Sequence, residues 1–314
     1  MSEQDVFFLL GAAKAGTTTL HHLLKQHPSI CMSRPKEPQF FERDEEWDRG
    51  KEFYFKNYFP HCDSESIDWY GDARQRNLYL PWVPNRIHQA FPETKLLVIV
   101  RDPVQRAFSH YWHNRRHGRE ELEPLEAMKR DEQRIQSGKT MDSTEEKKRY
   151  QESIRENRGL YRTYLDSGYY AQQLKRYEHF FDRDQIKVLI FERFVRSPVE
   201  STRSVFQYLD VKPDVTLETA QKNKGYVPRI QLVQRFIHNL GATVLSRLVP
   251  DVLKRRIKSM VSENRDYEEL HPDTARWLYK HFESHNEKLY DWLGSSVEAW
   301  EASRQSLTGQ GDTG

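Results

Sequence analysis

The sequence predicts an α/β protein in which helices flank a central parallel β-sheet. Short, continuous apolar runs, which are typical of strands buried on both faces, occupy residues 6–10, 95–100 and 187–191. Each run lies beside a segment whose apolar residues recur with helical spacing. Strands that alternate with helices indicate βαβ units, and the strands of such units are parallel.

The first part of the chain contributes strands and one helix. The run VFFLL at residues 6–10 predicts a buried strand, and the spacing of leucines predicts a helix over residues 17–27, which ends before Pro28. Short β-prone stretches predict two further strands, at residues 30–32 and 69–71.

The middle of the chain holds the clearest strand, KLLVIV at residues 95–100, which is continuous, apolar and β-branched. Pro103 suits the first turn of a helix, which the apolar pattern carries to about residue 116. KVLIF at residues 187–191 predicts another buried strand, preceded by a helix over residues 170–180.

Between residues 118 and 157 the chain is rich in charge, as in EELEPLEAMKRDEQRIQSGK. We interpret this stretch as solvated helices; the alternatives are a specific basic patch and a mobile segment that covers an active site. The pattern from residue 229 to residue 292 is again helical. We expect one domain over residues 1–300 and a disordered tail over residues 301–314.

Composition limits the classes of partner. A formal net charge of +2 does not argue for nucleic-acid or membrane-surface binding. No window reaches the ~18 apolar residues of a membrane span, and the N-terminus lacks the pattern of a secretory signal. Cys31 and Cys62 form neither a disulfide framework nor a CxxC metal pattern. We therefore expect a cytoplasmic protein with reduced thiols.

The segment GAAKAGTTTL follows the first strand and opens the first helix. A helix N-terminus offers backbone N–H groups and a partial positive charge to an anion. Lys14 adds a full charge, Gly16 permits close approach, and the threonines add hydroxyl donors. A plain surface turn is the alternative, but the strand–loop–helix order favours an anion site. The candidates are Lys14, Ala15, Gly16, Thr17, Thr18 and Thr19.

This loop differs from the ATP-binding loop GxxxxGK[ST]. Gly11 and Gly16 have the matching spacing, but Lys14 precedes the second glycine and Thr17 stands where ATP-binding loops have lysine. The displaced lysine argues against a standard kinase.

A second candidate anion site lies in VIVRDPVQRAFSHYWHNRR. Arg101 ends the strongest strand, at the sheet edge where ligands of open α/β sheets bind. Ser109 follows roughly two helical turns later, so both side chains are able to hold one phosphate. Pairing of Arg101 with Asp102, and an exposed Ser109, is an equally supported alternative on spacing alone.

Together, KAGTTTL and RDPVQRAFSHYWH resemble the sulfotransferases that use 3′-phosphoadenosine 5′-phosphosulfate (PAPS). The resemblance is closest to heparan sulfate sulfotransferases and their bacterial relatives, and it covers nearly the whole chain. It implies a fold like that of P-loop NTPases. It also implies that the first motif binds the 5′-phosphosulfate, while Arg101 and Ser109 bind the 3′-phosphate.

Two further segments take part in the resemblance. KEPQFF resembles the segment in which this family carries a catalytic glutamate, and the matching residue is Glu37. NKGYVPR resembles the late loop that closes over the nucleotide, and its matching residues are Gly225, Tyr226 and Arg229. One position departs: the heparan enzymes have an acidic residue and a lysine after the third strand, and here Asp72 is followed by Ala73.

The resemblance implies in-line transfer of a sulfuryl group to a hydroxyl or amine, with 3′,5′-adenosine bisphosphate (PAP) as the released product. The acceptor is expected to be a carbohydrate or a small metabolite. Lys14 is expected to stabilise the bridging oxygen of the leaving nucleotide, so that no metal is needed. Glu37 is expected to take the acceptor's proton.

Alternatives exist for the base and for the reaction. A loop acid such as Glu37 commonly forms a surface ion pair, here with Arg34 or Lys36. His110 and His113 flank the second motif and are rival bases. For the whole chain, the alternatives are a kinase-like enzyme that binds ATP with magnesium, and a nucleotide-binding module without catalysis.

Overall fold

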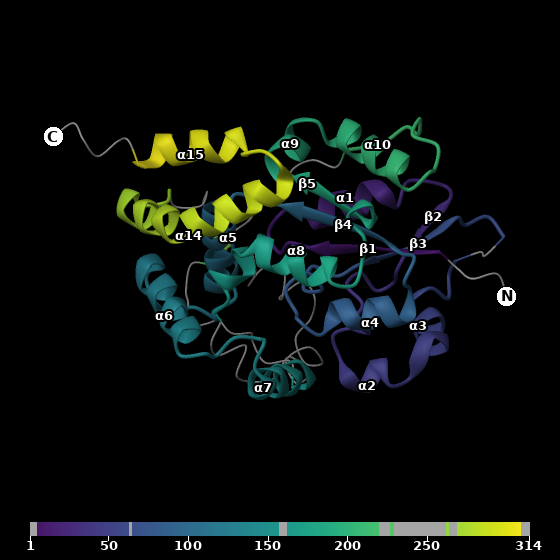
Figure 1. Cartoon of the computed structure of the whole chain (residues 1–314), viewed down its shortest axis with the longest axis horizontal. Helices are drawn as coiled ribbons and strands as arrows, with labels where there is room; N and C mark the ends of the chain where they lie inside the picture. Colours follow the sequence, from purple (N-terminus) through teal and green to yellow (C-terminus); the bar gives the residue numbers. More distant parts are fainter. Residues whose placement is uncertain are drawn as a thin grey trace.

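A five-stranded sheet forms the centre of the molecule in the computed structural model (Figure 1). Its order is β2-β3-β1-β4-β5, and all of its pairings are parallel. The predicted α/β class is therefore confirmed. The strands are β1 (Val6–Gly11), β2 (Ile30–Met32), β3 (Trp69–Ala73), β4 (Lys95–Val100) and β5 (Ile186–Ile190). The structure describes residues 5–62, 65–156, 162–219, 227–228, 262–263 and 269–308.

Helices cover both faces of the sheet. In Figure 1, α9 and α10 lie above the strands, while α3 and α4 lie below them. A short antiparallel pair, β6 (Val227–Pro228) with β7 (Ser262–Glu263), is separate from the sheet. The helices are α1 (Thr17–Leu24), α2 (Asp44–Trp47), α3 (Gly50–Tyr58), α4 (Val83–Ala90), α5 (Pro103–Arg116), α6 (Pro124–Gln136), α7 (Thr144–Arg155), α8 (Tyr170–Glu178), α9 (Phe191–Arg196), α10 (Pro198–Tyr208), α14 (Pro272–Leu293) and α15 (Glu298–Thr308).

The apolar runs form the interior strands because both of their faces are buried. The side chains of residues 6–10 are at most 2% exposed, and those of residues 96–100 are fully buried. Close packing also explains Gly71 in β3, where a Cβ atom would lie 2.6 Å from the ring of Phe7. The buried ladder fixes where each strand ends, and hence where the loops that follow β1, β2, β3 and β4 meet.

Most predicted elements are present, with some shifted ends. β3 continues to Ala73, and Phe191 opens α9 instead of closing β5. α1 ends at Leu24, earlier than predicted, because the N–H groups of Gln26 and His27 bond to carbonyls three residues back. Such bonds tighten the last turn of a helix and end its regular pattern.

The charge-rich stretch forms α6 and α7, but it is not uniformly solvated. Glu120 and Asp131 are 2% and 0% exposed, so the prediction of solvated helices is wrong for these acids. Arg162 pairs with Glu120, and Arg134 pairs with Asp131 at 2.8 Å. Buried carboxylates require such partners, because an unpaired buried charge is costly. Burial and the neighbouring Asp166 raise the pKa of Asp131 to about 7.

The two cysteines are joined. Cys31 in β2 and Cys62 beyond α3 form a disulfide, with their Cα atoms 6.0 Å apart. The expectation of reduced thiols is therefore wrong: the pairing depends on β2 and the end of α3 lying side by side, which cysteine spacing does not reveal. A location in the cytoplasm stays a prediction.

The C-terminal region is more ordered than the sequence suggested. The expected disordered tail begins inside α15, and Trp300 of that helix is only 1% exposed. Its indole N–H donates to Glu192 at 2.8 Å, which ties α15 to α9. A buried tryptophan contributes a large apolar contact area and an indole hydrogen bond, and both favour the folded helix. In the described part of the chain, no helix has both the length and the apolar character to span a membrane.

Candidate active site

The loop between β1 and α1 is shaped by two left-handed residues. Lys14 has φ 68° and Gly16 has φ 88°, and Gly16 is the residue that precedes α1. A Cβ atom at Gly16 would lie 3.0 Å from the ring of Phe191, so glycine satisfies both the backbone and the packing. The backbone N–H of Ala12 donates to the carbonyl of Ile99 at 2.7 Å, which anchors the loop to β4.

A cavity of about 610 Å³ opens beside this loop. It brings together residues from loops and helices that follow β1, β2, β3 and β4. The predicted site residues on its wall are Lys14, Gly16, Thr17, Thr18, Glu37 and Ser109, together with the rival bases His110 and His113. Segments far apart in the sequence thus meet at the carboxyl ends of the strands, as open α/β sheets predict.

Ala15 and Thr19 do not line this cavity. The backbone N–H of Ala15 donates to the carbonyl of Ala12 at 3.2 Å, and that of Thr19 donates to the carbonyl of Gly16 at 3.0 Å. Both amides are thus engaged within the loop and the first turn. Gly225, Tyr226 and Arg229 lie outside the residues that the structure describes.

Arg101 lies next to the loop between β1 and α1, which we call the phosphate loop. Its Nη1 donates to the backbone carbonyl of Lys14 at 3.1 Å, and its guanidinium carbon is 4.9 Å from the centre of the Phe191 ring. The carboxylate of Asp102 accepts from the N–H of Val104 at 2.8 Å and caps α5. Arg101 therefore braces the loop and is absent from the cavity wall, whereas Ser109 of α5 lines the cavity.

The environment of Lys14 is electropositive. Burial lowers the pKa of its ammonium, and the charges of Arg116 and Arg101 lower it further, while Glu37 acts in the opposite direction. Desolvation and like charges both disfavour the charged form of lysine. The charge of a bound anion would offset both effects, so this part of the cavity is suited to a multiply charged anionic ligand.

Glu37 lies between two cations at the cavity wall. Its Oε1 accepts from Lys36 Nζ at 3.0 Å, and its Oε2 accepts from Arg74 Nη1 at 3.2 Å. Lys36 Nζ also donates to Thr18 Oγ1 at 3.2 Å, which links this segment to the phosphate loop. The ion pair with Lys36 and a place on the cavity wall thus coexist, and the side chain is 28% exposed.

The two histidines of α5, His110 and His113, have lowered pKa values, so their charged forms are disfavoured. Burial and the charge of Arg106 hold the pKa of His110 well below its usual range. Burial and Lys14 lower the pKa of His113 to about 4. Both imidazoles are therefore neutral near pH 7, and their lowered pKa values make each a weaker base than an ordinary histidine.

Comparison with known proteins identifies the family. The family model for the sulfotransferase domain matches residues 4–224. The chain belongs to the sulfotransferase family. The human bifunctional heparan sulfate N-deacetylase/N-sulfotransferase 3 is 24% identical over 302 residues, which are 94% of this chain and 31% of that protein. The human N-deacetylase/N-sulfotransferase 2 is 23% identical over 305 residues, or 94% of this chain and 30% of that protein.

This sulfotransferase chain therefore spans about a third of these curated relatives. A solved sulfotransferase from Alicyclobacillus acidocaldarius is 27% identical, with a TM-score of 0.66 over 96% of this chain and 100% of the other. That structure supports the sulfotransferase fold over nearly the full length of the chain. The predicted family and fold are confirmed.

The sulfotransferase site includes residues that sequence reasoning missed. Gln75 and Arg76, which follow β3, line the cavity, and so do Asn114 and Arg119 near the end of α5. The sequence offered one indication of these residues: Ala73 replaces the lysine of the heparan enzymes, which marked the segment after β3 as different. Ala73 itself is buried in β3, and the cation of this loop that reaches Glu37 is Arg74.

Asp72, the acidic residue that precedes Ala73, lies away from the cavity. It is fully buried, accepts from the hydroxyl of Tyr54 at 3.0 Å and is absent from the cavity wall. Burial raises its pKa to about 7, against the hydrogen bond from Tyr54. Its role in the described structure is to hold β3 against α3.

A second cleft, of about 570 Å³, adjoins the cavity. Asn114 and Arg119 line both spaces. The wall of the second cleft is strongly basic, and its cationic side chains are Arg119, Arg130, Arg134, Lys139, Arg149 and Arg162. Cations on the wall of a cleft raise the local concentration of anionic ligands.

Proposed function

We propose that this sulfotransferase transfers the sulfuryl group of PAPS to a hydroxyl or amine of an anionic carbohydrate. The observation that carries the proposal is that Lys14 and Glu37 line one cavity with the phosphate loop and Ser109. The leaving nucleotide needs a cation, and the acceptor needs a base. Both groups are thus present on the wall of a single cavity.

The donor end of the cavity fits a nucleotide with two anionic ends. The N-terminus of α1, Lys14 and the hydroxyls of Thr17 and Thr18 suit the 5′-phosphosulfate. Ser109 supplies a hydroxyl for the 3′-phosphate, with Arg101 beside the loop. The lowered pKa of Lys14, caused by burial and then by neighbouring arginines, supports an anionic occupant.

The transfer step follows from this placement. The acceptor's oxygen or nitrogen forms a bond to sulfur while the bond from sulfur to the bridging oxygen breaks. The bridging oxygen keeps the electron pair and leaves as part of PAP, next to the ammonium of Lys14. The acceptor's proton passes to the carboxylate of Glu37. Sulfuryl transfer of this kind depends mainly on positioning and charge stabilisation.

The basic cleft supports an anionic acceptor. Arg134, Arg149 and Arg162 are paired with acids of the same region. Lys139 and Arg119 face the cleft from exposed positions, and the cleft continues from the cavity wall. The relatives named as heparan sulfate N-sulfotransferases act on a carbohydrate, which agrees with this acceptor class.

The test combines ligand binding with transfer. PAP should raise the melting temperature of the protein, while ATP with magnesium should not. Labelled PAPS should then sulfate an unsulfated uronic-acid polysaccharide in preference to a neutral polysaccharide or a simple phenol. A larger shift with ATP and magnesium would favour the kinase alternative. PAP binding without transfer to any of these acceptors would refute the proposed reaction.

A further inference from the structure

Arg74 joins two carboxylates that have different environments. It is the first residue after β3, and its side chain is 9% exposed. Its Nη1 donates to Glu37 on the cavity wall at 3.2 Å, while its Nε and Nη2 contact the carboxylate of Glu42. Glu42 is completely buried. The guanidinium therefore bridges from the interior of the protein to the predicted base.

Glu42, rather than Glu37, fixes the position of Arg74. Nε and Nη2 of Arg74 both contact one oxygen of Glu42, Oε2, and two contacts from one rigid, planar guanidinium leave its plane little freedom to rotate. Burial lowers the pKa of Arg74, but Glu42, Tyr150 and Glu37 together raise it above its ordinary value, so the side chain stays charged. Glu37 is the more exposed of the two carboxylates.

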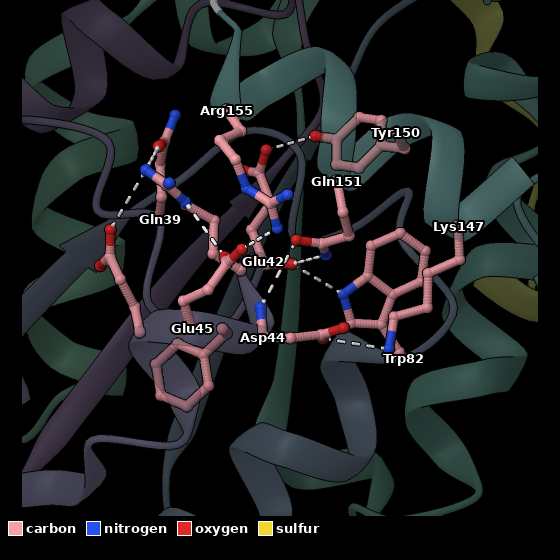
Figure 2. Close-up of polar contacts among 12 residues, drawn as sticks. Gln39, Glu42, Asp44, Glu45, Trp82, Lys147, Tyr150, Gln151 and Arg155 are labelled. Atoms are coloured by element: carbon pink, nitrogen blue, oxygen red, sulfur yellow. Dashed lines mark hydrogen bonds and ion pairs between the residues drawn. The ribbon is translucent and has the colours of Figure 1, made fainter.

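Helix α7 holds Glu42 in turn. Figure 2 shows Tyr150 and Gln151 of α7 turned toward Glu42. The Tyr150 hydroxyl donates to Glu42 Oε1, and the Gln151 amide donates to the Glu42 carbonyl. The indole N–H of Trp82 donates to the same carbonyl at 3.1 Å. Several independent bonds thus over-determine the position of this buried acid.

We propose that Arg74 is a positioning residue that directs the carboxylate of Glu37 into the cavity, and that Glu42 fixes the position of the Arg74 guanidinium. Arg74 is not on the wall of the cavity, so it acts through Glu37 and does not touch the substrate. The inference rests on the proposed function, because it assigns Glu37 the role of base. It also implies that α7, through its bonds to Glu42, helps to hold the base in place.

The bonding of Glu37 agrees with this role. Lys36 occupies Oε1 and Arg74 occupies Oε2, each with one hydrogen bond. A carboxylate offers about four acceptor sites, so an acceptor's proton still finds a free lone pair. Glu37 also has a left-handed backbone, with φ 68°, which its neighbours must hold in place.

The first test is structural and needs no acceptor. In a crystal structure of the Arg74→Gln variant, the Glu37 carboxylate should leave the position it has in a wild-type crystal. Arg86→Gln is the matched control, because Arg86 is also a largely buried arginine that binds the same loop, through the Phe41 carbonyl and Asp44. Glu37 in an unchanged position in Arg74→Gln would overturn the proposal.

The second test is kinetic. Arg74→Gln should lower kcat by about 10²-fold, as expected for a misplaced catalytic group, with little change in PAP affinity. Arg74→Lys should restore part of this loss, and Arg86→Gln should stay within about twofold of wild type. In a Glu37→Gln background, Arg74→Gln should have no further effect on kcat, because coupled residues are not additive.

Two outcomes would contradict the role of Arg74. One is a full kcat loss from Arg74→Gln in the Glu37→Gln background, and the other is an equal loss in Arg86→Gln. Removing Arg74 leaves Glu42 as an unpaired buried charge, so Arg74→Gln with Glu42→Gln provides a second variant if the single one does not fold. Absence of transfer by wild-type protein refutes the proposed function alone, while the crystal structures still decide the placement of Glu37.

Discussion

The replacement Glu37→Gln tests the base directly. Glutamine keeps the shape of the side chain but cannot take the acceptor's proton. Positioned general bases contribute about 10²–10⁴-fold in rate, which corresponds to about 3–5 kcal/mol of transition-state stabilisation. We expect a loss of kcat in this range. Affinity for PAP should be kept or improved, because the change removes a negative charge near Lys14.

The assay is transfer from labelled PAPS at saturating acceptor, together with calorimetric binding of PAP. Glu45→Gln is the matched control: Glu45 lies in the same region and pairs with Arg155, but it is not on the cavity wall. A kcat for Glu37→Gln within about threefold of wild type would remove Glu37 from the mechanism. A strong loss of PAP binding would show instead that Glu37 supports the nucleotide site.

Three further predictions concern charge and stability. Lys14→Met should lower kcat by about 10²–10³-fold, as for removal of a key electrostatic donor, measured in the same transfer assay. Asp72 has a pKa raised by burial to about 7 from 3.8, so its contribution to stability is lost as pH rises from about 4 through 7. Urea unfolding at pH 5 and pH 8 should show this decline in wild type and a flatter profile in Asp72→Asn; equal profiles would contradict the assignment. Replacing Cys31 and Cys62 by serine should cost about 3–4 kcal/mol, seen as a lower urea midpoint that dithiothreitol reproduces in wild type.

The sequence was a sufficient guide to the sheet because its strands are marked by composition. KLLVIV and VFFLL are buried on both faces, and burial on both faces requires continuous apolar runs. The phosphate loop was visible for a similar reason, since a strand, a glycine-bearing turn and a helix N-terminus follow one another in the chain. Lys14, Thr17 and Ser109 then line one cavity because those elements meet at one sheet edge.

Other features depend on contacts between distant segments. Arg74 reaches Glu37 only because β3 lies beside β2, and nothing in the local sequence distinguishes it from Arg76. Glu42 looks like any loop acid until α7 packs over it. The burial of Trp300 likewise requires α9, whose Glu192 accepts its indole N–H. Local composition carries no record of such partners.

The disulfide between Cys31 and Cys62 closes the chain into a covalent ring that includes Glu37 and Glu42. A protease cut at any single bond inside the ring leaves the two products linked. On a non-reducing gel, protein nicked in this way would therefore migrate as one species, and reductant would release two fragments. The carboxylate proposed as the base would remain covalently attached to β2 after such a cut. The disulfide therefore keeps Glu37 part of the molecule, in addition to stabilising the fold.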